Sequence, residues 1–474
     1  MQDLFNKLVL VLGLDESGQA ACRLLRAEGS KVFAFDTDHF PLSTAELAAL
    51  NEEGVQVITN ENELEQSPFD LVVLSSSLSR TENLVQKLLQ RGLRVVSDLE
   101  LATQKYFCLS IAVTGTNGKT TTAAIIERMM LQANRHVATA GGSGQAVCTI
   151  AEKTRHLDFA ALEVNSFQLE SIAHFRPSVA VLLNLQPDHM DRYDRMANFV
   201  RTVTRVFQNQ QVFDWAIIQS EALAHIRSLD LPIPSKIITF SAANRHADLH
   251  LDRSLLISKL PGWSGTLLDM DQCLLHGPHQ AENMMAALAV GHVLRLPLDE
   301  MVQALKTHPG GMHRFELVAE VNGVRFINDS KAMNVEAVRK GIESIAEGRG
   351  GEPNVWLIAG GRDKRLDYHD LGPLLARRVK GAFLLGECRE KLRAAWSLFT
   401  PCTLQESLHE AVRGAAENAE TGDVVLLSPA CSSFDMFQNY QHRGEVFKQA
   451  VEQWKETASD QNLPDSNPNE SPVK

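Results

Sequence analysis

Residues 109–132 read LSIAVTGTNGKTTTAAIIERMMLQ and pass from an apolar run through a glycine-rich turn into a helical pattern. Leu109–Val113 has the length of a buried strand, and Lys119–Gln132 has that of a helix. In the turn, Gly115 and Gly118 let successive backbone N–H groups point toward an anion, and the helix amino terminus adds its dipole. The stretch predicts an α/β fold with a phosphate-binding loop at the end of a parallel strand.

Nucleotide binding is the function that this loop predicts. The Lys119 ammonium group would meet the β- and γ-phosphates, and the Thr120 hydroxyl group would bind Mg²⁺. A generic phosphate loop has glycine at position 113, where Val113 stands, so a strand-to-helix turn with an exposed lysine is the alternative. The place of the motif between a strand and a helix favours the nucleotide. The predicted ATP contacts in the loop are Gly115, Thr116, Asn117, Gly118, Lys119, Thr120 and Thr121.

Short apolar strands alternate with helical patterns on the amino-terminal side of the loop. Leu8–Leu12, Lys31–Phe35 and Leu71–Leu74 are strand-sized, and Gln19–Glu28 has a helical pattern. This alternation is typical of parallel α/β wiring. It predicts a Rossmann-like domain over residues 1–105.

The loop itself belongs to a predicted central domain over residues 106–310. Further strands at Phe159–Leu162 and Val179–Leu183, and a helix at Ala281–Leu294, extend the pattern. We expect a P-loop ATPase-like parallel sheet here. The run Pro309-Gly310-Gly311 at its end predicts a hinge.

The α/β pattern restarts after the hinge and predicts a second Rossmann-like domain over residues 311–456. Its expected strands are Val324–Ile327, Val355–Ile358, Ala382–Leu385 and Val424–Leu427. Residues 457–474 are rich in Asp, Asn, Pro and Ser, and this composition predicts a disordered tail. The fold class is therefore α/β, with three α/β domains.

Composition limits the kinds of partner. The 474 residues carry 46 Lys and Arg against 58 Asp and Glu, so a basic footprint for nucleic acid is absent. The seven cysteines are scattered and form no CxxC pair, which is typical of the reducing cytoplasm. No apolar run reaches the roughly 20 residues that cross a bilayer. We expect a monomeric cytoplasmic protein that binds neither nucleic acid nor membrane.

The stretch Thr114–Thr121 resembles the ATP loop of the Mur ligase superfamily, which includes folylpolyglutamate synthases. Blocks similar to those of this family follow in order along nearly the whole chain. They are Glu163–Glu170, Asn184–Tyr193, His313–Glu316, Asn328–Lys331 with Asn334, Gly360–Lys364 and Leu427–Asp435. The resemblance implies an ATP-dependent, amide-bond-forming ligase that phosphorylates a substrate carboxylate, so that an amine can attack the acyl phosphate.

The Leu427–Asp435 block is most similar to that of family members that add D-glutamate to UDP-N-acetylmuramoyl-L-alanine. The resemblance therefore implies these two substrates, ATP and Mg²⁺ as cofactors, and a role in peptidoglycan precursor synthesis, hence in cell shape and division. The sequence leaves the choice between D- and L-glutamate open.

The resemblance also implies the catalytic and metal-binding groups, with Lys119, His189 and Lys331 as catalytic residues. Thr120 and Glu163 would hold one Mg²⁺, and His189 would hold a second through a neutral imidazole nitrogen. Glu163 could instead be a helix-capping or surface residue, and His189 could instead cap a helix.

On the nucleotide, Gln280 and Asn283 match the adenine-side block, Arg314 would reach the phosphates, and Asp329 would accept from the ribose. A helix cap with a surface amide is the alternative for the first pair, and an internal ion pair for the second.

Substrate contacts are expected at both ends of the chain. Gly13-Leu14-Asp15-Glu16-Ser17-Gly18 lacks the second glycine of a dinucleotide fingerprint and is similar to the UDP-binding loop of the family. The implied UDP-precursor contacts are Gly13, Ser17, Gly18, Asp36, Thr37 and Ser75, with Asn165 and Ser166 from the central domain. The implied amino-acid contacts are Lys364, Ser433, the Phe434 backbone and Tyr440, although Ser428–Phe434 could also be an ordinary strand end.

Several positions depart from the family pattern. Ser75-Ser76-Ser77 stands where Ser-Pro-Gly is usual, Gly142 where asparagine is common, and Met333 where a threonine usually contacts glutamate.

A lysine that CO₂ carbamylates normally follows the Asp-His-Met-Asp block in the family member resembled. Here no lysine lies between Lys153 and Lys236, and Val203 or Thr204 takes its place. We expect the second metal to be held differently or more weakly.

Two rival functions remain at this point. One is a ligase of the same superfamily with another amino acid, such as an L-glutamate-adding variant or a folylpolyglutamate synthase. The Gly13 loop and the Ser428–Asp435 block disfavour the folate enzyme. The other is a nucleotide-binding pseudoenzyme, which only the missing lysine supports.

Overall fold

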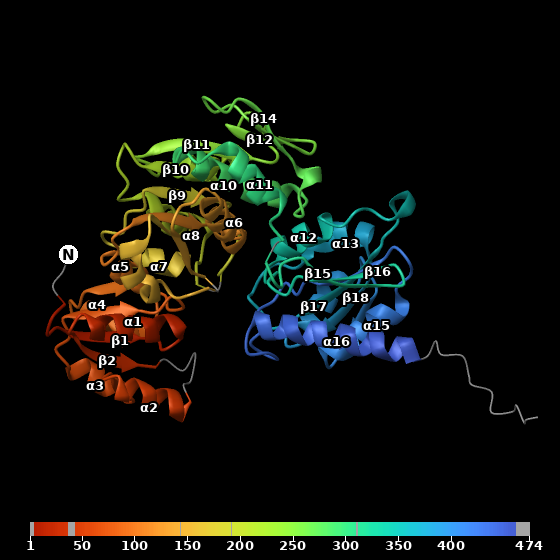
Figure 1. Ribbon diagram of the computed structural model, residues 1–474. Helices are drawn as coiled ribbons and strands as arrows, with labels where there is room; N and C mark the ends of the chain where they lie inside the picture. Colours follow the sequence, from red (N-terminus) through yellow and green to blue (C-terminus); the bar gives the residue numbers. More distant parts are fainter. Residues whose placement is uncertain (1–3, 37–42, 143, 191, 310, 461–474) are drawn as a thin grey trace, which may run out of the picture. The chain divides into compact units, whose positions relative to one another are not determined.

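The computed structural model describes residues 4–36, 43–142, 144–190, 192–309 and 311–460 (Figure 1). The chain forms two compact units that divide between Pro309 and Gly310, with Asp188–Asp191 grouped in the second. The first unit contains two sheets and the second contains one. Within these described ranges, no helix combines the length and apolarity that a membrane crossing needs.

The first sheet is parallel and has the strand order β3-β2-β1-β4-β5. Its strands are β1 (Leu8–Leu12), β2 (Lys31–Phe35), β3 (Gln56–Ile58), β4 (Leu71–Leu74) and β5 (Val95–Ser97). Its helices are α1 (Glu16–Ala27), α2 (Thr44–Glu52), α3 (Glu61–Gln66), α4 (Asn83–Gln90) and α5 (Asp98–Thr103). The strand order reverses between β1 and β4, and such a switch point opens a ligand crevice at the carboxyl ends of the two strands.

The second sheet has nine strands in the order β14-β13-β12-β11-β10-β9-β6-β8-β7. They are β6 (Leu109–Thr114), β7 (Val137–Gly141), β8 (Phe159–Glu163), β9 (Val179–Leu182), β10 (Trp215–Gln219), β11 (Lys236–Ser241), β12 (Leu249–Asp252), β13 (Leu255–Ser258) and β14 (Gly265–Asp269). The expected parallel arrangement holds from β7 to β12, but β13 and β14 are antiparallel. Only Arg253 and Ser254 join β12 to β13, and so short a connection permits only a hairpin.

Helices and short 3₁₀ turns cover both faces of this sheet. They are α6 (Lys119–Gln132), η1 (Val147–Ile150), η2 (Glu152–His156), α7 (Ser166–Glu170), α8 (Met196–Thr204), η3 (Arg205–Phe207), α9 (Ser220–Ser228), η4 (Met270–Gln272), α10 (Pro278–Val293) and α11 (Leu298–Lys306). One hydrophobic core includes Val11 of β1 and Leu162 of β8, so the first two sheets share buried apolar contacts.

The third sheet has the order β15-β16-β20-β17-β18-β19 and is parallel except for β15. Its strands are β15 (Glu316–Val321), β16 (Val324–Asn328), β17 (Val355–Gly360), β18 (Val379–Leu385), β19 (Cys402–Leu404) and β20 (Val424–Leu427). The helical segments are α12 (Val335–Glu343), η5 (Arg349–Gly351), η6 (His369–Leu371), α13 (Gly372–Arg378), α14 (Arg389–Trp396), α15 (Leu408–Asn418) and α16 (Tyr440–Asp460).

Helix α16 extends into the first residues of the predicted tail, which begins at residue 457. The helix continues to Asp460, and the rest of that tail lies outside the described residues. Phe447 and Val451 anchor the helix in the core, and no glycine or proline follows before Pro464, so propagation continues past the last buried turn. The α/β class itself is confirmed, whereas the limits of the three domains stay predictions.

Candidate active site

The phosphate loop joins β6 to α6 as its sequence predicts. Gly115 has a φ of 128° and Gly118 a φ of 90°, a region that glycine enters without strain. The Lys119 Nζ atom donates to the Gly115 carbonyl oxygen at 2.7 Å and to that of Thr116 at 3.0 Å. The lysine side chain is thus turned back onto its own loop.

Two residues after β9 form hydrogen bonds with this loop, although neither was predicted to have a role. The Asn117 N–H donates to Asn184 Oδ1 at 2.9 Å, and Asn184 Nδ2 donates to the Asn117 carbonyl oxygen at 3.0 Å. The Thr116 hydroxyl group donates to the Gln186 carbonyl oxygen at 3.0 Å. Because β9 pairs in parallel with β6, polar residues at its carboxyl end were the signal for this role.

Thr120 and Glu163 meet at the amino end of α6, as the resemblance implied. The Thr120 hydroxyl group donates to Glu163 Oε2 at 2.6 Å, and the Glu163 side chain is buried at the end of β8. A hydroxyl and a carboxylate oxygen are donors that suit Mg²⁺. A Cβ atom on Gly142 would overlap this carboxylate, so glycine at that position gives Glu163 its room. Asn165, not Glu163, caps α7.

His189 lies in a left-handed conformation with a φ of 52°. Its Nε2 atom is 3.7 Å from Asp188 Oδ2, and its backbone N–H donates to Asp188 Oδ1 at 3.0 Å. It does not cap a helix, since α8 begins later, at Met196. Asp191 lies outside the described residues. Among the residues that are described, no cluster of three or more His, Cys, Asp or Glu side chains has the arrangement of a metal site.

Gln280 and Asn283 are both buried near the start of α10. The Asn283 Nδ2 atom donates to Gln280 Oε1 at 3.1 Å, and the Thr122 hydroxyl group donates to Asn283 Oδ1 at 3.2 Å. A Cβ atom on Gly118 would overlap Asn283 Oδ1. The pair therefore lies against the phosphate loop, and it is neither the cap of α10, which is Gly277, nor a surface amide.

The expected UDP-precursor residues Gly13, Gly18 and Ser75 come together at the carboxyl ends of β1 and β4. A Cβ atom on Gly18 would overlap the Gly13 carbonyl oxygen, and one on Gly13 would lie 2.5 Å from Ser75 Oγ. Asn165 reaches the same region, because its Nδ2 atom donates to the Ser76 carbonyl oxygen at 2.9 Å.

Three further residues were expected to contact the UDP-linked precursor, namely Asp36, Thr37 and Ser166. Asp36 directly follows β2, and Ser166 is buried in the first turn of α7. Thr37 lies outside the described residues.

In the second unit, Lys331 and Tyr440 are brought together across 109 positions of sequence. The Lys331 Nζ atom lies 4.0 Å from the centre of the Tyr440 ring. Lys331 follows β16, and Tyr440 begins α16. The structure thus joins a predicted catalytic residue to a predicted amino-acid contact.

Asp329 and Arg314 do not form the ion pair that was their alternative explanation. The Arg314 charge acts on the Asp329 carboxyl group only at a distance, where it partly opposes the rise in the pKa of that group. Asp329 instead accepts from the Phe315 N–H at 3.2 Å and from the Ser428 hydroxyl group at 3.2 Å, and burial raises the pKa of its carboxyl group to about 7. In the described part of the chain, the buried Arg314 Nη2 atom has no hydrogen-bond partner. A buried guanidinium N–H of this kind fits an anionic ligand.

The expected amino-acid contacts lie on loops after β17 and β20. Lys364 is half-buried, whereas Phe434 is 52% exposed. The Ser433 hydroxyl group is buried and has no hydrogen-bond partner among the residues that the structure describes. A buried hydroxyl group of this kind suits a polar ligand, and the role of Ser428–Phe434 in binding the amino acid stays a prediction.

Arg443 of α16 links these loops, a role that was not predicted from the sequence. Its side chain is 1% exposed, and it donates from Nη2 to the Ser330 carbonyl oxygen at 2.8 Å and to that of Cys431 at 3.2 Å. Its Nε atom donates to Ser330 Oγ at 3.0 Å. One buried guanidinium group therefore holds the loop that carries Lys331 and the loop that carries Ser433.

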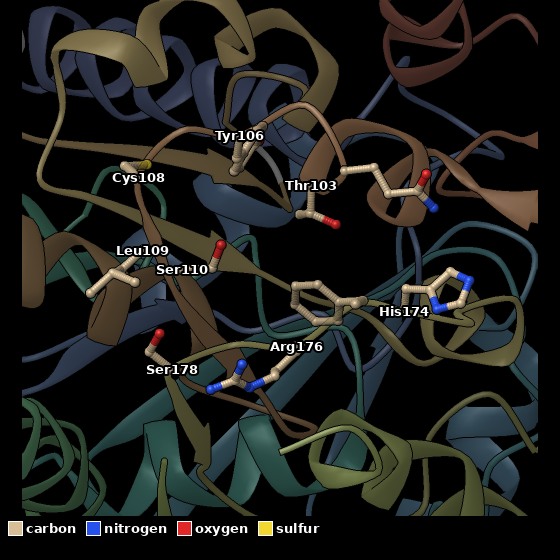
Figure 2. A pocket seen from close by; sticks show the side chains of 10 residues that line it. Thr103, Tyr106, Cys108, Leu109, Ser110, His174, Arg176 and Ser178 are labelled. Atoms are coloured by element: carbon tan, nitrogen blue, oxygen red, sulfur yellow. The ribbon is translucent and has the colours of Figure 1, made fainter. Parts of the chain in front are cut away.

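A cavity of about 260 Å³ lies in the first unit, away from the phosphate loop (Figure 2). Figure 2 shows Thr103, Tyr106, Ser110, His174, Arg176 and Ser178 around it. Ser110 and Ser178 stand at the amino ends of β6 and β9, whereas the phosphate loop follows the carboxyl end of β6. The cavity therefore belongs to the opposite edge of the sheet from the predicted site.

Comparisons with known proteins agree with this arrangement. The Mur ligase middle domain matches residues 113–291, and the Mur ligase, glutamate ligase domain matches residues 313–431. A UDP-N-acetylmuramoylalanine--D-glutamate ligase of Acidobacterium capsulatum is 36% identical over 454 residues, which cover 95% of this chain and 97% of that protein. The protein of the same name from Pelotomaculum thermopropionicum is 35% identical over 458 residues, 95% of this chain and 98% of that protein.

Among solved structures, MurF ligase from Thermotoga maritima in complex with ADP has a TM-score of 0.61 at 16% identity, covering 96% of this chain and 100% of that one. MurC from the same organism has a TM-score of 0.60 at 15% identity, covering 95% and 100%. At such identities the likeness concerns the fold alone. The two domain matches and the relatives above 30% identity along nearly the whole length establish that the chain belongs to the Mur ligase family.

Proposed function

We propose that this chain is an ATP-dependent ligase that joins D-glutamate to UDP-N-acetylmuramoyl-L-alanine during peptidoglycan precursor synthesis. The observation that carries the proposal is the similarity over 95% of the chain to proteins named for that reaction. The strand–loop–helix unit that presents Lys119 supplies the matching chemistry, because it suits the phosphates of ATP.

The reaction needs an activated carboxylate. Transfer of the γ-phosphoryl group of ATP to the alanyl carboxylate yields an acyl phosphate, and the amine of glutamate then displaces phosphate. Negative charge develops on the transferring oxygens, and catalysis of such transfers rests on positioned cations. Lys119 and Arg314 are the cations that we assign to the nucleotide phosphates, and Lys331 is a further one.

We assign Mg²⁺ to Thr120 and Glu163, whose oxygens lie 2.6 Å apart. When bound there, the ion would polarise phosphate oxygens as a Lewis acid. His189 is the proposed ligand of a second ion. Gln280 and Asn283 would face the adenine side, and Asp329 the ribose.

The two substrates are assigned to opposite ends of the chain. The crevice at the carboxyl ends of β1 and β4 would take the UDP group, through Gly13, Ser17 and Ser75. The loops after β17 and β20, with Lys364 and Ser433, and Tyr440 at the start of α16 would take the carboxylates of glutamate, since cations and hydroxyl donors suit them. All seven cysteines are free, which suits our assignment of the enzyme to the reducing cytoplasm.

Phosphate release measures the proposal directly. The assay contains the chain with MgATP, UDP-N-acetylmuramoyl-L-alanine and D-glutamate, and each component is omitted in turn. We expect turnover only in the complete mixture, with the dipeptide product identified by mass. Turnover with L-glutamate but not D-glutamate would support the L-glutamate variant, and turnover with a folate and glutamate would support the folylpolyglutamate synthase. Nucleotide binding without turnover would support the pseudoenzyme.

A further inference from the structure

Asp98 is a buried carboxylate at the junction of three helices, and no part of the proposed reaction uses it. It is the first residue of α5 and is 1% exposed. Helices α1 and α7 both contact α5 (Figure 1). A charged group taken this far out of water needs strong hydrogen bonds.

Asp98 has such bonds from each of the three helices. Its Oδ2 atom accepts from the Ser17 hydroxyl group at 2.5 Å, and its Oδ1 atom accepts from Gln168 Nε2 at 2.9 Å. The Leu99 N–H donates to Oδ1 at 2.8 Å. Ser17 belongs to α1 and Gln168 to α7, so one carboxylate connects the first sheet to the second.

The bonds continue from Ser17 into the loop after β4. The Ser76 N–H donates to Ser17 Oγ at 3.2 Å, and the Ser77 hydroxyl group donates to Asp15 Oδ2 at 2.5 Å. The Ser76 carbonyl oxygen in turn accepts from Asn165 of the second sheet at 2.9 Å. The Ser17–Asp98 bond therefore supports one of the two contacts, Ser17–Ser76, that join residues 13–17 to residues 75–77, and the second contact is Asp15–Ser77.

We propose that Asp98 is a positioning residue that holds these two loops in place for the UDP-linked substrate. The role rests on the proposed function, because it assumes that the loops bind the UDP group. Asp98 does not touch the substrate and acts through Ser17.

The ionisation of Asp98 makes the role measurable. Burial raises the pKa of its carboxyl group to about 6, and the nearby Asp15 carboxylate adds to the rise, while the donors Ser17, Gln168 and Leu99 oppose it. The other titratable groups that face it are Tyr106 and Cys148, and burial raises the pKa of both well above their usual values. Both stay neutral near pH 6, so Asp98 and Asp15 are the carboxylates of this cluster.

Protonation reverses the key bond. An ionised Asp98 accepts a charge-assisted hydrogen bond from Ser17, whereas a protonated Asp98 donates a weaker, neutral bond to the Ser17 oxygen that also accepts from the Ser76 N–H. The loop after β4 then loses part of its support. We expect the KM for UDP-N-acetylmuramoyl-L-alanine to rise about tenfold as the pH falls through 6, the effect of weakening one charge-assisted hydrogen bond.

Asp98→Asn tests this role, because its amide group permanently donates to Ser17 in the way that the protonated carboxyl group does. Its KM for the UDP-linked substrate at pH 8 should equal that of the wild type at pH 5, and its pH profile should be flat. The kcat and the KM for ATP should stay within twofold. In a Ser17→Ala background, Asp98→Asn should change the KM no further, because the group through which it acts is gone.

Glu100→Gln is the matched control. Glu100 is buried on the same helix and accepts from the N–H groups of Ala173, His174 and Phe175, but it does not contact Ser17. The Glu100→Gln variant should have a lower melting temperature than the wild type, but its KM for the UDP-linked substrate should still rise as the pH falls through 6. Gln168→Leu is a second variant should Asp98→Asn fail to fold; it removes a donor to Asp98, so the inflection should move to higher pH.

An unchanged inflection in Asp98→Asn, or an equal rise in the KM for ATP and for the UDP-linked substrate, would overturn the role. Calorimetric titration with UDP-N-acetylmuramoyl-L-alanine repeats the comparison without turnover. A wild type that binds this substrate without catalysing the reaction would thus contradict the proposed function and still report on Asp98. A wild type that does not bind it would contradict both.

Discussion

Lys119 donates to two carbonyl oxygens of its own loop, and these bonds must give way to phosphate when nucleotide binds. Lys119→Ala removes the cation nearest to the transferring phosphoryl group. We expect phosphate release to fall by at least ~10²–10³, the usual effect of losing one such donor, with an unchanged melting temperature. Lys153→Ala, at an exposed lysine of the same unit, is the control and should keep full activity. Near-normal turnover in Lys119→Ala would remove the nucleotide from this loop.

Asp329, which we assign to the ribose, is a buried carboxyl group that lowers stability when it is ionised. Burial raises its pKa from the ordinary 3.8 to about 7, so the folded chain holds this proton more tightly than the unfolded chain does. Stability is therefore lost as the pH rises from about 4 to about 7, because folding then disfavours the ionised form. Asp329→Asn should raise the melting temperature at pH 8 but hardly at pH 5, and should raise the KM for ATP. Equal shifts in melting temperature at both pH values would contradict this account.

The missing lysine leaves no group of similar chemistry at its place. The Thr204 hydroxyl group is buried and donates to the Val200 carbonyl oxygen at 2.7 Å, and Val203 belongs to the hydrophobic core. Neither supplies an anionic oxygen, so activity should be indifferent to CO₂. Turnover in decarbonated buffer should equal that in bicarbonate, and half-maximal activity should need more Mg²⁺ in His189→Ala than in the wild type. A bicarbonate-reversible loss of activity would show that a lysine elsewhere is carbamylated.

At the scale of elements, α16 holds two site loops through Arg443, whose guanidinium group is enclosed by carbonyl oxygens. Burial lowers its pKa to about 10, so it remains charged at neutral pH. Arg443→Leu removes this charge and leaves the Ser330 and Cys431 oxygens without a donor, at about 1–3 kcal/mol for each buried group. Urea unfolding should show the loss, and the KM for glutamate should rise more than that for ATP.

Arg443→Lys separates the charge from the geometry, because one ammonium group cannot reach all the oxygens that the guanidinium fork reaches. It should restore only part of the stability. Arg393→Leu, at an exposed arginine of α14, is the control and should unfold like the wild type. Wild-type stability and kinetics in Arg443→Leu would show that the two loops keep their positions without it.

At the scale of the whole molecule, the cores predict two unfolding transitions. The first two sheets share a core, whereas the third sheet has its own. Phe240→Ala, in the first unit, and Phe326→Ala, in the second, each remove a buried ring at a cost of about 3–5 kcal/mol. By calorimetry, each variant should lower the midpoint temperature of one transition and leave that of the other unchanged. Three transitions would show that the first two sheets unfold independently, and one would show that the units unfold together.

The α/β class and the strand–loop–helix unit of residues 109–132 could be predicted from the sequence. Both depend on neighbours along the chain, because strand length, glycine turns and helix starts are local signals. The loop of residues 115–118 lies between β6 and α6, and Thr120 contacts Glu163, while the nucleotide and metal roles of these residues stay predictions. The antiparallel strands β13 and β14 escaped prediction because strand direction is a matter of pairing, which no single strand encodes.

Which distant groups support the site could not be predicted, because they meet only in the folded chain. Asn117 and Asn184 are 67 positions apart, Ser17 and Asp98 are 81 apart, and Ser330 and Arg443 are 113 apart. In the sequence, Asp98 looks like an ordinary acidic residue of a first helical turn. Arg443 likewise looks like an ordinary cation on a helix surface. Their roles follow from burial, because a polar group removed from water must find partners wherever the fold brings them, and that choice is made by packing and not by sequence distance.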